Sequence, residues 1–205
     1  NQPQGIVITP DGKYAYITNF TDNKITVISV LDENIYTYIS TGIGPIGIAI
    51  SPTGQYVYCT NSTSNTVSVI NTTSNSVVRT INVGQVPYGI CISPDGSKLY
   101  VSNSVSNSVS VINTSTYVVT NIAGVGTSPT GVSINREGTR LFVASRSNAN
   151  TTVINTSTNA VIASVSVNGT GYSFGNFTTN VITVPCPPVI EGFDKISICN
   201  DPVFT

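Results

Sequence analysis

Short runs that alternate apolar and polar residues follow one another along the whole chain. Residues 48–50 (Ile-Ala-Ile) and 90–92 (Ile-Cys-Ile) show the pattern, which places two isoleucines on one face of an extended segment. Runs of about five to seven residues, separated by turn-forming residues roughly every ten positions, indicate β-strands. No convincing 3.6-residue periodicity is present. We therefore predict an all-β fold with almost no helix.

The strands recur as a repeat of 42 residues, marked by Pro-x-Gly-apolar at Pro3, Pro45, Pro87 and Pro129. Four occurrences in one phase identify a repeat architecture. Each repeat contains a first strand, such as residues 47–50 of the second repeat, then a second strand, such as residues 98–101 of the third repeat. A polar turn follows. A third strand follows at 25–29, 67–71, 109–113 and 151–155, and a less regular fourth at 77–83 and its equivalents. Each repeat is therefore predicted to form a four-stranded antiparallel sheet.

The first two strands of each repeat are joined by a turn with a recognisable sequence. Pro10, Pro52 and Pro94 set a backbone φ near −65°, and glycine follows two residues later. We expect positive φ at these glycines, which are Gly12, Gly54, Gly96 and Gly138. Asp11 and Asp95 are interpreted as turn residues.

Side-chain size changes along the repeat as a radial packing of sheets requires. Small residues (Ala49, Cys91, Ser133) lie on one face of the first strand and allow neighbouring sheets to approach. A series of large aromatic residues on the second strand fills the wider outer gap: Tyr16, Tyr58, Tyr100 and Phe142. This taper is typical of a β-propeller, in which each sheet forms one blade.

The residues also resemble a known family. Tyr16-Ile-Thr-Asn19, Tyr58-Cys-Thr-Asn61 and Tyr100-Val-Ser-Asn103, with the Ser93-Pro-Asp-Gly96 turn, are similar to the YVTN β-propeller repeats of surface-layer and secreted proteins. The resemblance covers residues 3–178 and implies a scaffold rather than an activity. The family usually has about seven blades, so four complete repeats imply missing blades or assembly. An isolated arc would expose an apolar sheet face at each end.

The predicted organisation follows from the repeat. Residues 1–178 form the propeller blades, and 179–205 form a non-repeat tail containing Pro and Cys. The pattern starts a fifth time at Tyr172 and then stops, so residues 171–178 are interpreted as a closing strand. The repeats lie near 3–44, 45–86, 87–128 and 129–170.

Charge is scarce in this chain. Only 8% of residues are charged, with eight Lys and Arg, nine Asp and Glu, and a net charge of −1. Most polar residues are Ser, Thr and Asn. No basic stripe is present for phosphate contacts, so nucleic acid is not expected as a ligand. No apolar run reaches the length of a membrane span and no leader opens the chain, so any signal or anchor is expected outside these residues.

The candidate chemistry favours a non-enzymatic protein. The chain contains no His, which removes the usual general base and metal ligand. Five of its acids fall in predicted turns: Asp11, Asp22, Asp32, Glu33 and Asp95. A lactonase-like propeller would hold a cation in its central channel, but no phased acidic ring is present. We predict no catalytic residues, no metal and no cofactor.

Two further sets of polar residues have competing interpretations. Arg136, Arg140 and Arg146 suggest an anion site or solvent-facing turn residues, and the turn favours the second. The sequence also contains eight Asn-x-Ser/Thr glycosylation motifs, at Asn19, Asn61, Asn71, Asn113, Asn150, Asn155, Asn168 and Asn176. Asn71, Asn113 and Asn155 occupy one repeat position, where glycans would decorate the rim. The alternative is that Asn simply favours the turn there, and the composition alone accounts for most of the motifs.

The four cysteines divide into two pairs. Cys186 and Cys199 bracket the Pro-containing tail and are the candidate disulfide, which would suit an oxidising compartment. Cys59 and Cys91 lie in apolar strand patterns and are interpreted as buried thiols rather than a second bridge.

These observations together predict an extracellular or cell-surface structural module that forms a surface layer, sheath or filament. Its partners would be further copies of itself or neighbouring surface proteins. The alternatives are an adhesion module that binds a glycan or protein ligand and, less favoured, a lactonase-like or cofactor-bearing enzyme.

Overall fold

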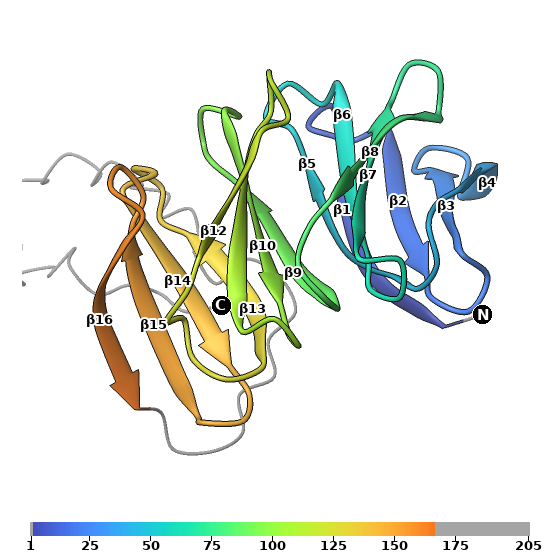
Figure 1. Ribbon diagram of the computed structural model, residues 1–205. Coiled ribbons are helices and arrows are strands. Elements are labelled where there is room, and N and C mark those ends of the chain that lie inside the picture. Colours follow the sequence, from blue (N-terminus) through green and yellow to red (C-terminus); the bar gives the residue numbers. More distant parts are fainter. Residues whose placement is uncertain (1, 167–205) are drawn as a thin grey trace, which may run out of the picture.

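The computed structural model describes residues 2–166 as four separate four-stranded antiparallel sheets. Figure 1 shows the sheets side by side in chain order, from blade 1 in blue to blade 4 in orange. Strand order within each sheet follows the sequence, so every blade is a simple meander. The predicted all-β propeller arrangement of four blades is confirmed. The proposed closing strand 171–178 and tail 179–205 lie outside the described residues.

The strands have nearly equal lengths in all four blades. Blade 1 contains β1 (Pro3–Ile8), β2 (Tyr14–Asn19), β3 (Lys24–Ser29) and β4 (Asn34–Ser40). Blade 2 contains β5 (Pro45–Ile50), β6 (Tyr56–Asn61), β7 (Thr66–Asn71) and β8 (Ser76–Asn82). Blade 3 contains β9 (Pro87–Ile92), β10 (Lys98–Asn103), β11 (Ser108–Asn113) and β12 (Val119–Ile122). Blade 4 contains β13 (Pro129–Ile134), β14 (Arg140–Ser145), β15 (Asn150–Asn155) and β16 (Ala160–Ser166).

The turns between the first two strands have the predicted geometry. Gly12, Gly54, Gly96 and Gly138 all have positive φ, between 71° and 75°. Asp95 accepts hydrogen bonds from the Ser93 hydroxyl at 2.5 Å and the Ser97 amide at 3.0 Å, which closes the turn. These bonds lower the pKa of Asp95 to about 2. Asp95 is therefore a turn residue, as predicted.

The hydrophobic core is divided into three clusters, one at each junction between blades. The first joins Tyr16, Ile25 and Val27 of blade 1 to Val57 and Cys59 of blade 2. The other two clusters join blade 2 to blade 3 and blade 3 to blade 4 in the same way. Each internal sheet thus buries both of its faces, and the interfaces between sheets are the core of the molecule.

The sheets approach closely at their first strands and separate toward their fourth strands. Strands β1, β5, β9 and β13 contact one another in sequence, whereas β4 and β8 contact each other much less. The closest approach is made by glycine rather than by the small residues singled out from the sequence. A Cβ on Gly5 would lie 2.7 Å from the carbonyl oxygen of Ile46, and one on Gly47 would overlap the carbonyl oxygen of Tyr88. Only glycine fits this contact.

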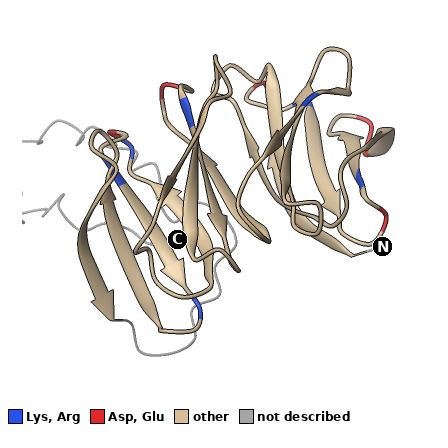
Figure 2. Ribbon diagram, in the orientation of Figure 1, with Lys and Arg blue, Asp and Glu red and all other residues tan. Residues whose placement is uncertain are grey.

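Charged residues are few, and most lie in turns and at strand ends, with Arg79 in the middle of β8 as an exception (Figure 2). Lys13 and Asp11 pair at 3.5 Å within one turn, and Lys24 and Asp22 pair at 3.5 Å within another. Residues 2–166 include no helix that is long and apolar enough to cross a lipid bilayer.

Candidate functional site

A hydroxyl group links each of the first three blades to the next one. Thr18 Oγ1 accepts a hydrogen bond from the Gly5 amide at 2.8 Å and donates one to the Ile46 carbonyl at 2.8 Å. The link thus spans the first strands of blades 1 and 2. Two further residues make the same pair of bonds: Thr60 with Gly47 and Tyr88, and Ser102 with Gly89 and Thr130. We call these three side chains the hydroxyl links.

An asparagine forms a second link at the same three junctions. Asn23 lies in the turn between β2 and β3 with φ 55°, and its side-chain oxygen accepts a bond from the Gly44 amide at 2.9 Å. Gly44 belongs to the loop that leads into blade 2. The equivalent asparagine links are Asn65 to the Val86 amide and Asn107 to the Ser128 amide, both at 2.8 Å.

Blade 4 lacks the side chains that form both links. Ala144 occupies the position of the hydroxyl links, and Ala149 that of the asparagine links. Ala149 nevertheless keeps the left-handed conformation, with φ 47°, which is unfavourable for alanine. The backbone of the repeat is therefore preserved in blade 4 although its linking groups are lost.

The face of blade 1 that points away from blade 2 has the residue pattern of a blade interface, and no blade covers it within residues 2–166. Ile6 is 63% exposed, whereas Val132 at the same repeat position in blade 4 is 3% exposed. Ile8 is 55% exposed and its blade 4 equivalent, Ile134, is 5% exposed. Ile35, on the fourth strand of blade 1, is also more than half exposed. We call this surface the open face of blade 1.

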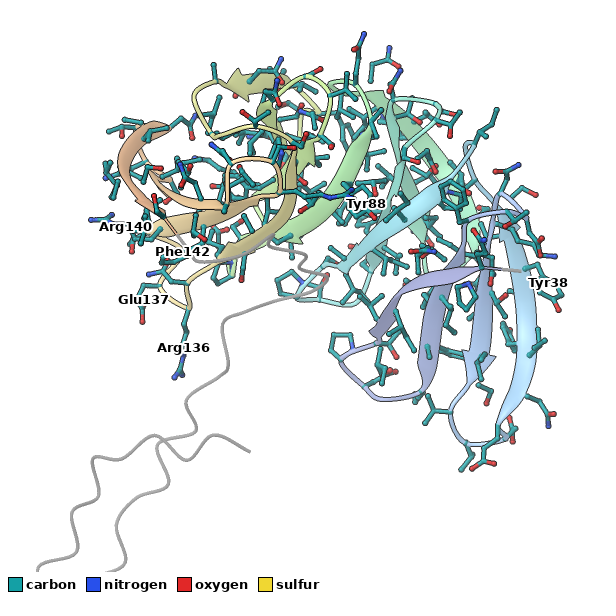
Figure 3. All side chains as sticks on the ribbon, turned by 90° about the horizontal axis from the view of Figure 1, so that it is seen from below. Tyr38, Tyr88, Arg136, Glu137, Arg140 and Phe142 are labelled. Carbon is teal, nitrogen blue, oxygen red and sulfur yellow. The ribbon has the colours of Figure 1, made fainter. Side chains whose placement is uncertain are left out.

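The first strands of the four blades surround a hollow of about 320 Å³ on the inner side of the arc. Its walls are backbone and aliphatic side chains from all four blades, with Gln4 and Tyr88 as the polar residues among the described ones. Figure 3 shows Tyr88 near the inner strands of the arc. No group of three or more acids and cysteines that could hold a metal is found within residues 2–166. The described walls of this hollow thus supply hydrogen-bonding groups but no ionised side chain.

The three arginines singled out from the sequence do not form one site. Arg136 lies in the β13–β14 turn and Arg140 begins β14, whereas Arg146 follows the other end of that strand. A six-residue strand separates these ends by about 20 Å. Figure 3 shows Arg136 and Glu137 projecting from the tip of the turn. The interpretation as a single anion site is therefore wrong.

Two of the eight glycosylation motifs are inaccessible in the folded structure. Asn19 and Asn61 are buried, and Asn61 is 0% exposed. The Asn61 amide nitrogen donates to the hydroxyls of Thr66 at 3.0 Å and Ser68 at 2.9 Å. A glycan on this nitrogen would break both bonds and disrupt the sheet.

The other motifs differ in their surroundings. Asn71, Asn113 and Asn155 close the predicted turns, because each side-chain oxygen accepts bonds from backbone amides two and three residues later. Asn150 accepts a bond from Ser166 at 3.2 Å. Glycosylation of these four stays a prediction, and Asn168 and Asn176 lie outside the described residues.

The cysteines follow the same division as in the sequence. Cys59 and Cys91 are buried free thiols, and burial raises the pKa of both, which keeps them protonated. Cys186 and Cys199 lie outside the described residues, so their pairing stays a prediction.

Sequence reasoning missed both links between blades. The signal was present, because Thr18, Thr60 and Ser102 recur at one position and so do Asn23, Asn65 and Asn107. A hydroxyl conserved between repeats inside an otherwise apolar strand requires a buried partner. Its loss in blade 4 was equally visible in the sequence.

Comparison with known proteins agrees with this architecture. The Kuenenia stuttgartiensis hydrazine synthase structure matches with a TM-score of 0.76 and 27% identity, over 80% of this chain and 49% of that one. The dihydro-heme d1 dehydrogenase NirN matches with a TM-score of 0.71 and 17% identity, over 82% and 38%. A functionally unknown protein from Desulfotomaculum acetoxidans matches with a TM-score of 0.69 and 19% identity, over 80% and 57%. The chain thus spans about half the length of the structures it matches.

Sequence comparison identifies the family. No curated protein matches the chain. The family described as "Lactonase, 7-bladed beta-propeller" matches residues 1–92 and 80–165, which together cover all four blades. The chain therefore belongs to the seven-bladed lactonase-type β-propeller family.

Proposed function

We propose that this chain is a non-catalytic structural module of an extracellular or cell-surface assembly. The observation that carries the proposal is the open face of blade 1. Ile6, Ile8 and Ile35 lie at repeat positions whose equivalents pack against a preceding blade elsewhere in the arc. Burial of this face against a neighbouring copy of the chain would provide the association energy.

The use of polar side chains within the repeat also supports a structural role. The repeated hydroxyls and asparagines bind backbone groups of the next blade and hold the sheets together. The inner hollow, where propeller enzymes of this family would bind a cation, is walled by backbone, aliphatic groups, Gln4 and Tyr88 among its described residues. The repeated hydroxyls and asparagines thus bind backbone groups and do not form a reactive cluster.

The surface composition supports an extracellular location. Charged residues make up only 8% of the chain, and Ser, Thr and Asn supply most of the polar surface. Asn113 is exposed at a rim turn in an Asn-x-Ser motif, and Asn71 and Asn155 repeat its position. Glycans at these three positions would lie on one rim, away from the faces that join blades.

The proposal is tested by the mass of the native particle, measured by light scattering and electron microscopy. We expect a particle that contains several copies of the chain. An Ile8→Asp variant should dissociate it without loss of thermal stability, because Ile8 is 55% exposed in the single chain. The matched control is Ile134→Asp, which changes the same repeat position at a buried junction and should unfold the chain instead. A native particle with the mass of one chain would overturn the proposal.

The family relationship makes lactone hydrolysis the competing activity. It is tested on the same preparation with a simple γ-lactone in the presence of divalent cations. Turnover that disappears when Gln4 or Tyr88 is replaced would place the function in the inner hollow and overturn the structural proposal.

A further inference from the structure

A second cleft, of about 380 Å³, lies between blades 2 and 3 at the outer part of their junction. Blade 2 contributes Tyr56 and Tyr58 of β6, together with the turn before that strand. Blade 3 contributes Asp95, Thr114 and Tyr117 from two of its turns. Aromatic rings and hydroxyl groups therefore face the same space.

Tyr58 lines the cleft with a phenol that has no hydrogen-bond partner in the described part of the chain. The residue is 3% exposed. Burial raises the pKa of Tyr58 to about 12, so the phenol stays neutral and keeps its proton. A phenol without a partner inside the chain is available to donate to water or to a ligand in the cleft.

At the first junction the equivalent phenol has an acceptor within the chain. Tyr16 is the blade 1 equivalent of Tyr58, and its phenol donates to the side-chain oxygen of Asn75 at 2.7 Å. The residue at the position of Asn75 in blade 3 is Tyr117, which offers no carbonyl oxygen. This one replacement removes the internal acceptor and adds an aromatic wall.

The third junction is also arranged differently. Asn159 returns at the position of Tyr117, and the Lys98 ammonium group crosses the junction to the Thr156 carbonyl at 3.1 Å. Tyr100, the equivalent tyrosine there, also makes no hydrogen bond within the described residues, and the Asn159 side-chain oxygen is left without a partner. The feature that distinguishes the junction of blades 2 and 3 from both neighbours is therefore the aromatic wall of Tyr117.

The walls of the cleft define the class of ligand. Tyr117 is held in place by Arg79, whose guanidinium carbon lies 4.6 Å from the ring centre. Asp95, the charged side chain among the lining residues, is ionised and therefore disfavours an anion. The neutral hydroxyls and the Tyr58 donor require a ligand with several oxygen acceptors and donors, and the rings require an apolar face. A pyranose sugar has both features.

We propose that the cleft between blades 2 and 3 binds a sugar ring of a neutral oligosaccharide. The ring packs against Tyr117, and one of its oxygens accepts the hydrogen bond of Tyr58. This site is independent of the open face of blade 1, so either proposal can fail without the other.

The test is calorimetric titration of the purified protein with maltotriose, cellotriose and tri-N-acetylchitotriose. We expect at least one trisaccharide to bind with a Kd on the order of 1 mM or tighter. Tyr58→Phe keeps the ring and removes the donor, and should weaken binding about 10-fold. Tyr117→Asn restores the residue of blade 2 and should abolish binding.

The matched control is Tyr16→Phe, which removes the same hydroxyl at the first junction and should leave binding unchanged. Thermal unfolding of each variant verifies that it is folded before titration. The proposal is overturned if no trisaccharide binds, if Tyr58→Phe binds as well as the parent chain, or if Tyr16→Phe weakens binding equally. Binding of choline in place of the sugars would also overturn it, since that result identifies a cation site.

Discussion

The first three blades and the fourth share a backbone but differ in the groups that join one blade to the next. Thr18, Thr60 and Ser102 each bond to the following blade, whereas blade 4 has Ala144. The asparagine links end in the same way at Ala149. The difference separates residues that form a blade from residues that join blades. Strand pattern and turn glycines belong to the first class and persist in blade 4.

The two ends of the arc are consequently unlike. Blade 1 presents an open apolar face, together with the backbone that receives links at every other junction. Blade 4 has lost the side chains that would form these links to a following blade. The proposed contact of this face with a neighbouring copy would therefore depend on hydrophobic burial, and it should be weaker and more readily reversed than the junctions within the chain.

The largest expected effect comes from a methyl group placed inside a junction. Gly47→Ala adds a Cβ that overlaps the Tyr88 carbonyl oxygen, so the two blades must separate. We expect a loss of about 3 kcal/mol in the free energy of unfolding, measured by urea denaturation. Gly124→Ala is the control, because no atom lies within 4 Å of its added Cβ and only its φ of 74° is unfavourable. Equal losses in the two variants would contradict the tight junction.

Removal of one hydroxyl link should have the next largest effect. Thr60→Val keeps the shape of the side chain but removes the hydroxyl that accepts from the Gly47 amide and donates to the Tyr88 carbonyl. We expect a loss of about 2 kcal/mol by urea denaturation. Thr60→Ser, which copies Ser102 of the next blade, should cost much less. A valine variant as stable as the serine variant would show that the hydroxyl does not join the blades.

Two opposite substitutions at the asparagine position should move stability in opposite directions. Asn65→Ala loses the bond to the Val86 amide and places alanine at φ 57°, which should cost about 1 kcal/mol or slightly more. Ala149→Asn places a tolerant residue at φ 47° and should gain about 0.5 kcal/mol. Both changes are measured as shifts in Tm. Stabilisation by Asn65→Ala would contradict the role of the link.

The smallest effect concerns acid stability. Hydrogen bonds from Ser93 and Ser97 lower the pKa of Asp95 from 3.8 to about 2 in the folded chain. A lowered folded-state pKa contributes stability at neutral pH, and this contribution is lost as pH falls from 3.8 toward 2. Because Asp95 is exposed, the contribution should stay below about 1 kcal/mol. Asp95→Asn should reduce the decrease in Tm between these pH values. Thr53, at the same position in blade 2, shows that an uncharged residue is tolerated in this turn. A decrease in Tm at acid pH that is the same in Asp95→Asn and the parent chain would contradict the lowered pKa of Asp95.

Much of the fold was predictable because the repeat displays its local rules four times. The Pro-x-Gly spacing gave the strand order, and the glycine of each turn gave the positive φ. The contacts that define the candidate sites were not predictable in this way. The Thr18 hydroxyl donates a hydrogen bond to a blade that begins more than twenty residues later. The hydrogen bond between Tyr16 and Asn75 spans 59 residues. Such partners become visible only when the sheets are stacked.

The arginines show that residues close along the chain can lie far apart in space, as the favoured interpretation as separate solvent-facing residues implied. Arg140 and Arg146 are separated by one strand, and a strand carries its two ends to opposite rims of the blade. The glycosylation motifs illustrate a third limit. Asn61 and Asn71 read alike in the sequence, but one amide is buried in the sheet and the other lies in a turn.

The direction of the links also restricts how such an array can lengthen during evolution. The linking side chains lie in the second strand and the following turn of one blade, and the backbone groups that they bond lie at the start of the next. A duplicated copy of blade 2 therefore carries both the linking side chains and the backbone groups that receive links. Such a copy can follow blade 2 directly, without new mutations. A duplicated blade 4 brings only the backbone groups that receive links, so its junction with any unit placed after it lacks both links. Growth by duplication is thus favoured within the first three units and disfavoured beyond the fourth.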